Sequence, residues 1–153
     1  LDAHCGGGTA ELVADEPRIW QQDVSVDDFD GYVSSERIQL RMVRDSAVYL
    51  DQVSSCLRWA DSSGVPFDLC LYNAGMDPYE GSADGGLEGI TRAMLSERED
   101  LVFDWCRKRA LPMAFVLAGG YVGARLDAAG LVDLHRLTLA AAVRSARLTA
   151  AEQ

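Results

Sequence analysis

The sequence has 153 residues, of which 48% are hydrophobic, and a formal net charge of -10 from 24 acidic and 14 basic residues. This length predicts one compact domain or a piece of one, and the acidic surplus argues against a nucleic-acid partner, because phosphate binding needs clustered lysine and arginine. No apolar run is long enough to span a membrane and no secretory leader is recognisable, so we expect a cytoplasmic protein.

Taken in chain order, the sequence opens with "LDAH", which fits the end of a strand, and continues with three glycines that would let the chain turn before Thr9 caps a short helix. Apolar segments rich in strand-forming residues predict strands over residues 18–26, 66–75 and 111–120. The last two are nearly continuous apolar runs, as in a parallel sheet covered on both faces. Residues 23–40 predict a long irregular loop.

Three segments repeat apolar residues at three- and four-residue steps, which predicts amphipathic helices. The first runs from Val43 to Ala60, the second from Ile90 to a basic final turn at residues 107–109, and the third over residues 128–146. Alternating strands and helices predict an α/β fold with a parallel sheet, helices on both faces and three α/β/α layers.

Ligands of such sheets bind beyond the carboxyl ends of the strands, where the sequence has Asp23, Asp77, Tyr121 and, if "LDAH" ends a strand, His4. In an extended segment Asp2 and His4 point to the same side and can converge on one ion. Carboxylate and imidazole ligands suit a catalytic zinc, and Asp77 is the natural third ligand. The spacing alone leaves turn chemistry as an alternative.

Other residues have simpler interpretations. The four cysteines form no C-x-x-C pair, which predicts reduced, mostly buried thiols, and His135 is expected to be a packing or surface residue of the third helix. The glycine run lacks the lysine of a phosphate-binding loop. Tyr121 follows Gly119 and Gly120, whose flexibility could place the phenol beside a developing oxyanion, although an exposed tyrosine after a strand is also common.

Four blocks, in order, resemble the zinc-dependent histone deacetylase superfamily, which has the arginase/deacetylase fold: "LDAHCGGGTAEL", "FDLCLYNAGMDPYEG", "GGLEGITRAMLSEREDLVF" and "LPMAFVLAGGYVG". The similarity is greatest to the class IV branch and bacterial relatives. It covers nearly the whole chain and implies that residues 1–153 are the carboxyl-terminal portion of one catalytic domain.

The resemblance implies that Asp2, His4 and Asp77 bind Zn²⁺, and that Tyr121 polarises the acyl carbonyl of an acylated lysine peptide or small acylated amine. It also implies a monovalent cation, K⁺, near Asp2, His4 and Asp23, with Gly119 and Gly120 at the substrate rim. The family's tandem His-His general base has no counterpart here. Gly7 and Ser82 also depart from the family's usual side chains.

These departures imply that the chain alone is inactive and needs a missing amino-terminal half or a second copy as partner. Two alternatives remain open at this point. One is a degenerate, non-catalytic α/β module that keeps a metal site. The other is a dinuclear manganese ureohydrolase of the arginase type, for which a second D-x-H cluster would be expected.

Overall fold

The computed structural model describes residues 1–151, and from β2 onward its strands and helices alternate along the chain. A short 3-10 turn, η1 (Ser46–Val48), leads into the second helix. The remaining elements, in chain order, are α1 (Gly7–Leu12), β1 (Gln21–Ser25), β2 (Ile38–Met42), α2 (Tyr49–Ser62), β3 (Cys70–Gly75), α3 (Arg92–Lys108), β4 (Met113–Ala118) and α4 (Ala128–Ala151).

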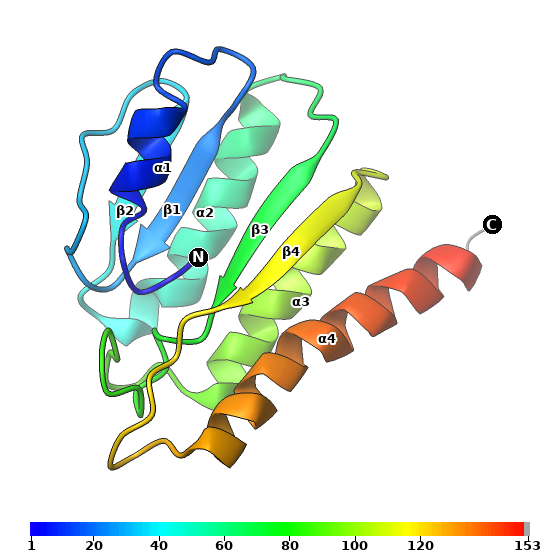
Figure 1. The fold of residues 1–153 in the computed structure, drawn as a ribbon. Helices are drawn as coiled ribbons and strands as arrows, with labels where there is room; N and C mark the ends of the chain where they lie inside the picture. Colours follow the sequence, from blue (N-terminus) through cyan, green and yellow to red (C-terminus); the bar gives the residue numbers. More distant parts are fainter. Residues whose placement is uncertain (152–153) are drawn as a thin grey trace.

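The strands form two separate parallel pairs. β1 pairs with β2 from Gln21 opposite Ile38, and β3 pairs with β4 from Cys70 opposite Met113. Within the described part of the chain, no strand pairing joins β1 to β3. Figure 1 shows the four strands side by side in the order β2, β1, β3, β4, with the amino terminus between the two pairs.

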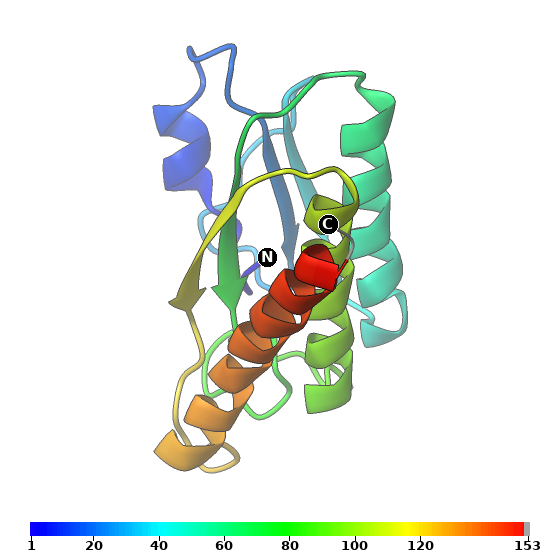
Figure 2. The ribbon, with the colours of Figure 1, turned by 90° about the vertical axis from the view of Figure 1, so that its right-hand side faces the viewer.

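The helices cover the strands unequally. Figure 2 shows α2, α3 and α4 on one side of the strands and the short helix α1 on the other. The expected α/β class is confirmed, but the second helical layer consists of the six-residue α1. The open face of β3 and β4 leaves Leu71 77% and Val116 60% exposed, although their strands are apolar enough to be covered on both sides.

The core lies between the strands and the three long helices. α2 contributes Tyr49, Val53 and Cys56, which recur at the three- and four-residue steps that place side chains on one face of a helix. In the same core Phe103 of α3 packs edge-on against Tyr72 of β3, with ring centroids 6.2 Å apart. Burial of these apolar faces fixes the helices against the strands.

Two local expectations were wrong. Residues 38–42 form β2, although residues 23–40 were expected to be an irregular loop. The strand was missed because five residues of mixed polarity give little apolar signal. Thr9 lies inside α1, and the residue that caps this helix is Gly6, in the left-handed conformation with φ 75°. The three predicted strands and the three longer helices are present with shifted ends.

All four cysteines are free, and three of them, Cys5, Cys56 and Cys106, are buried. None of the described helices combines the length and the apolar character that crossing a bilayer requires.

Candidate metal centre

The first residues of the chain lie between the two sheets, at the carboxyl ends of β1 and β3. Leu1 N donates a hydrogen bond to Asn73 O (3.2 Å), and Leu1 O accepts one from Gly75 N (3.1 Å). On the opposite side, Ala3 O accepts hydrogen bonds from the two N–H groups that follow β1, at 2.9 and 2.8 Å. The segment therefore connects the two sheets at the edge where parallel strands present ligand-binding residues.

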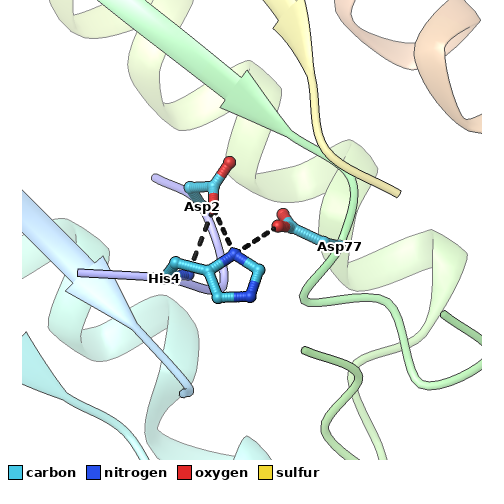
Figure 3. A group of neighbouring side chains, drawn as sticks. All are labelled: Asp2, His4 and Asp77. Atoms are coloured by element: carbon cyan, nitrogen blue, oxygen red, sulfur yellow. Dashed lines mark hydrogen bonds and ion pairs between the residues drawn. The ribbon is translucent and has the colours of Figure 1, made fainter. Parts of the chain in front are cut away.

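Asp2, His4 and Asp77 converge at this edge (Figure 3). His4 Nδ1 lies 3.2 Å from Asp2 Oδ1 and 3.1 Å from Asp77 Oδ2. One potential ligand atom of each residue lies within 4.8 Å of the other two. The structure thus brings together the three side chains that the sequence predicted as ligands, although His4 and Asp77 are 73 positions apart in the sequence.

Asp77 has the most enclosed carboxylate of the three. The residue is fully buried, and its Oδ1 accepts a hydrogen bond from Ala3 N at 3.1 Å. Its Oδ2 accepts no hydrogen bond from any described residue, although His4 Nδ1 is within 3.1 Å, because that single ring nitrogen also faces Asp2. A buried carboxylate oxygen without a donor is costly, and a cation between the carboxylates would compensate it.

The titration behaviour reflects this crowding. Burial, followed by the hydrogen bond and charge of Asp2, raises the pKa of Asp77 to about 7. Burial opposes ionisation of Asp2 as well, but hydrogen bonds from Asp77 and from His4 N outweigh it and lower the pKa of Asp2. Burial opposes the charge on His4, yet the neighbouring carboxylates raise its pKa. The crowding of the two carboxylates therefore opposes ionisation of Asp77, and a cation between them would relieve this repulsion.

The donor set fits zinc. Two carboxylate oxygens and one imidazole nitrogen are the ligands of an open catalytic zinc site, and ligands about 2.0–2.1 Å from a tetrahedral ion lie roughly 3.3 Å apart. The distances from His4 Nδ1 to Asp2 Oδ1 and to Asp77 Oδ2, 3.2 and 3.1 Å, are close to that spacing.

Tyr121 lies beside His4, one of the three candidate ligands Asp2, His4 and Asp77, which we call the ligand group. Its ring is edge-on to that of His4, with centroids 6.2 Å apart, and 43% of the residue is exposed. The Tyr121 N–H donates to Ser82 Oγ at 3.0 Å, and its carbonyl accepts from Ala83 N at 2.9 Å. Desolvation and then the carboxylate of Asp77 raise the pKa of Tyr121, so the phenol keeps its proton and can donate a hydrogen bond.

Two glycines allow the chain after β4 to approach the site. Gly119 and Gly120 both have left-handed conformations, with φ of 60° and 90°. A Cβ atom at Gly119 would overlap the carboxylate of Asp77, and one at Gly120 would overlap Leu131. Both glycines are therefore required by close packing, and Gly119 borders the ligand group directly.

Asp23 is not part of the ligand group. Its Oδ2 accepts hydrogen bonds from Gln21 Nε2 and from Tyr32 Oη, the latter at 2.7 Å. The carbonyl of His4, which was expected beside a monovalent cation, accepts a hydrogen bond from Ser25 Oγ at 3.0 Å. The K⁺ site stays a prediction.

Sequence reasoning missed three residues at this centre. Phe29 packs edge-on against His4 with centroids 5.8 Å apart, and it is 70% exposed. Arg98 and Glu99 are fully buried in α3, beneath the ligand group. Their position between Leu95 and Val102 on the apolar stripe of the helix was the available signal, because charged residues are rare on such a stripe.

No family model matches the sequence. Histone deacetylase 2 of Arabidopsis thaliana is 27% identical over 144 residues, which cover 89% of this chain and 37% of that protein. An uncharacterized protein of Picosynechococcus sp. is 32% identical over 124 residues, covering 79% of this chain and 41% of that protein. The similarity to histone deacetylase 2 supports a distant relationship to the histone deacetylases. The chain spans about two fifths of the length of these two curated relatives.

Proposed function

We propose that this chain forms the metal-binding part of a zinc-dependent deacylase that hydrolyses an acyl-lysine-like or acylpolyamine amide. The observation that carries the proposal is the convergence of Asp2, His4 and Asp77, in which a buried carboxylate oxygen has no hydrogen-bond donor among the described residues. The similarity to a histone deacetylase supports deacetylase-type hydrolysis in general terms. A relationship to the class IV branch of the histone deacetylase superfamily is also part of the proposal.

In this proposal Asp2, His4 and Asp77 hold the zinc ion. A bound zinc ion acts as a Lewis acid toward a carbonyl and lowers the pKa of a coordinated water. Tyr121 donates its phenolic hydrogen bond to the oxygen of the substrate carbonyl as negative charge develops there. Gly119 and Gly120 let the chain after β4 bring that tyrosine to the edge of the ligand group, and Ser82 fixes its backbone.

The general base is proposed to come from outside this sequence. The sequence has two histidines, and the second, His135, lies in α4 and is not part of the ligand group. The curated relatives are more than twice as long as the matched region, so a longer polypeptide has room for a base.

The substrate is proposed to carry positive charge near the scissile amide. The chain has a net charge of -10, and Asp84 lies close enough to raise the pKa of His4, after the larger effects of Asp2 and Asp77. An acylated lysine in a basic peptide and an acylated polyamine both satisfy this condition, because negative potential attracts cationic ligands.

One observation favours a second candidate function. Because the ligand group contains no imidazole besides His4, this chain can also be a non-catalytic module that retains a metal site. Zinc binding without deacylation by the full-length gene product would favour that function.

The metal proposal is tested by the zinc content of the purified full-length gene product, measured by mass spectrometry. We expect one zinc per site in the wild type and loss of stoichiometric zinc in Asp77→Asn, which cannot supply a negative ligand. Asp51→Asn, an exposed acidic position in α2, is the matched control and should retain zinc. A wild-type protein that holds no zinc would show that the proposal is wrong.

Catalysis is tested separately with an acetyl-lysine peptide. Tyr121→Phe removes the hydrogen-bond donor and is expected to lower kcat by roughly 10²–10³-fold, the usual cost of losing one oxyanion donor. Equal rates in the two proteins would remove Tyr121 from the mechanism.

A further inference from the structure

α3 contains an ion pair with no access to solvent. Arg98 and Glu99 are both 0% exposed, and two side-chain nitrogens of Arg98 donate to Glu99 Oε1, Nε at 2.8 Å. Tyr72 Oη donates to the same oxygen at 2.8 Å. Burying two charges costs free energy that their mutual attraction often fails to recover, so a buried pair alone is weak evidence of a stabilising role.

The third nitrogen of Arg98 points away from Glu99 and toward the metal centre. Arg98 Nη1 donates to Gly75 O at 2.7 Å and lies 3.4 Å from Leu1 O, with Tyr49 Oη at 3.2 Å. Hydrogen bonds from a guanidinium are stronger than neutral ones, and the planar group can serve several acceptors at fixed angles.

The two carbonyls belong to the segments that carry the proposed ligands. Leu1 directly precedes Asp2, and Gly75 lies two residues before Asp77. The same segments also bond to each other, through Gly75 N to Leu1 O at 3.1 Å. One guanidinium therefore bridges the two pieces of backbone whose spacing determines whether the ligands converge.

We propose that Arg98 is a positioning residue of the metal centre, which holds the Leu1 and Gly75 carbonyls together and so fixes Asp2 relative to Asp77. The proposal rests on the proposed zinc site. Glu99 neutralises the buried guanidinium and fixes its orientation, and Tyr72 fixes Glu99. Arg98 itself contacts no substrate or metal.

The test uses the full-length gene product and the zinc dissociation constant measured by competition with a chromogenic chelator. The substitution Arg98→Lys keeps the positive charge, but a single ammonium group cannot donate to both carbonyls and to Glu99 as the planar guanidinium does. We expect zinc affinity to fall by about 10–100-fold, the usual effect of losing a group that orients metal ligands. Amide exchange of Ala3 and Gly75 in the metal-free protein should accelerate.

Val102→Ala is the matched control from the same helix. It removes two buried methyl groups four residues after Arg98 and leaves the hydrogen bonds of Arg98 intact. It should lower the melting temperature of the metal-free protein without changing zinc affinity. If Arg98→Lys does not fold, Tyr49→Phe replaces it, because this change removes one anchor of Arg98 Nη1 and should weaken zinc binding to a smaller extent.

The outcomes separate the two proposals. Wild-type zinc affinity in a folded Arg98→Lys, or in Tyr49→Phe where the lysine variant fails to fold, would overturn the positioning role and leave the zinc site in place. Equal losses of zinc affinity in Arg98→Lys and Val102→Ala would also overturn it, because they would show a general effect of core stability. Absence of zinc from the wild-type protein would instead overturn the proposed function, and with it the role of Arg98.

Discussion

Gly119 shows how little space surrounds the ligand group. Its α-carbon is so close to Asp77 that a methyl group there would overlap the carboxylate, and its φ of 60° disfavours any side chain. The burial of Asp77 therefore depends on a residue without a side chain in the loop after β4. Exclusion of water at this point contributes to the raised pKa of Asp77.

Gly119→Ala is expected to destabilise the protein and to weaken zinc binding by about tenfold. The left-handed backbone costs about 1–3 kcal/mol for a residue other than glycine, and displacement of Asp77 disturbs the ligand spacing. Chemical denaturation and chelator competition measure the two effects.

Gly8→Ala is the control for the Gly119 prediction, because the added methyl group would meet only Asp30 Oδ2 at 3.8 Å. It should leave zinc affinity unchanged. Unchanged zinc affinity in Gly119→Ala as well would contradict the close packing of this loop against Asp77.

At the site, sequence reasoning predicted residues near the strand ends and missed Phe29, in the loop after β1, and the buried charged pair of α3. Alternation in an extended segment placed Asp2 and His4 on one side, and the resemblance pointed to Asp77. Arg98 and Glu99 belong to a run of charges, "SERED", that is typical of a solvated helix surface. Their spacing with Leu95 and Val102 was the available local signal of burial, and no local pattern reveals the Leu1 and Gly75 carbonyls to which Arg98 donates.

α3 is the element that connects the core to the metal centre. Its buried stripe contains Leu95, Val102 and Phe103 as well as the charged pair, and its amino terminus is capped by Thr91 Oγ1, which accepts a hydrogen bond from Met94 N at 3.3 Å. Displacement of this helix would therefore shift Arg98 and at the same time disturb the packing of α3 against β3.

Leu95→Ala should lower the free energy of unfolding by about 2–5 kcal/mol, because the side chain is fully buried and its removal leaves a cavity. Leu148→Ala, at a residue of α4 that is 48% exposed, should change it by no more than about 0.5 kcal/mol. Urea denaturation measures both. Similar effects at the two positions would contradict the packing of α3 described above.

Element type was predictable where the apolar pattern was long. Three strands and three helices were predicted because each has a sustained run or period in apolar residues. β2 was missed because its sequence, "IQLRM", includes Gln39 and Arg41 and follows a polar segment. Its pairing with β1 supplies the stabilisation, and such pairing between distant residues cannot be read from local composition.

At the scale of the whole molecule, one face of the β3 and β4 pair is open. In the register of this pair Asn73 is opposite Val116, and Leu71 lies two residues earlier on the same face. The high exposed fractions of Leu71 and Val116 indicate an apolar patch, which no described residue covers. Such patches mark surfaces where soluble proteins contact other protein segments.

The double variant Leu71→Thr, Val116→Thr of the 153-residue chain should bind less of the dye ANS than the wild type, because threonine suits a strand but is less apolar. Its melting temperature should stay within a few degrees, since little buried area is lost. Leu148→Thr, which changes an exposed leucine of α4, should alter ANS fluorescence less. ANS binding unaffected by the double variant would show that this face is not accessible.

The position of residues 1–3 between the two sheets couples sheet separation to metal affinity. Leu1 is bonded to β3, Ala3 is bonded to the backbone after β1, and Asp77 follows β3. A change in the distance between β1 and β3 must therefore change the spacing between the ligands. Insertion of any segment between β1 and β3 would therefore be thermodynamically linked to metal binding at the proposed site. Each would change the binding constant of the other by the same factor.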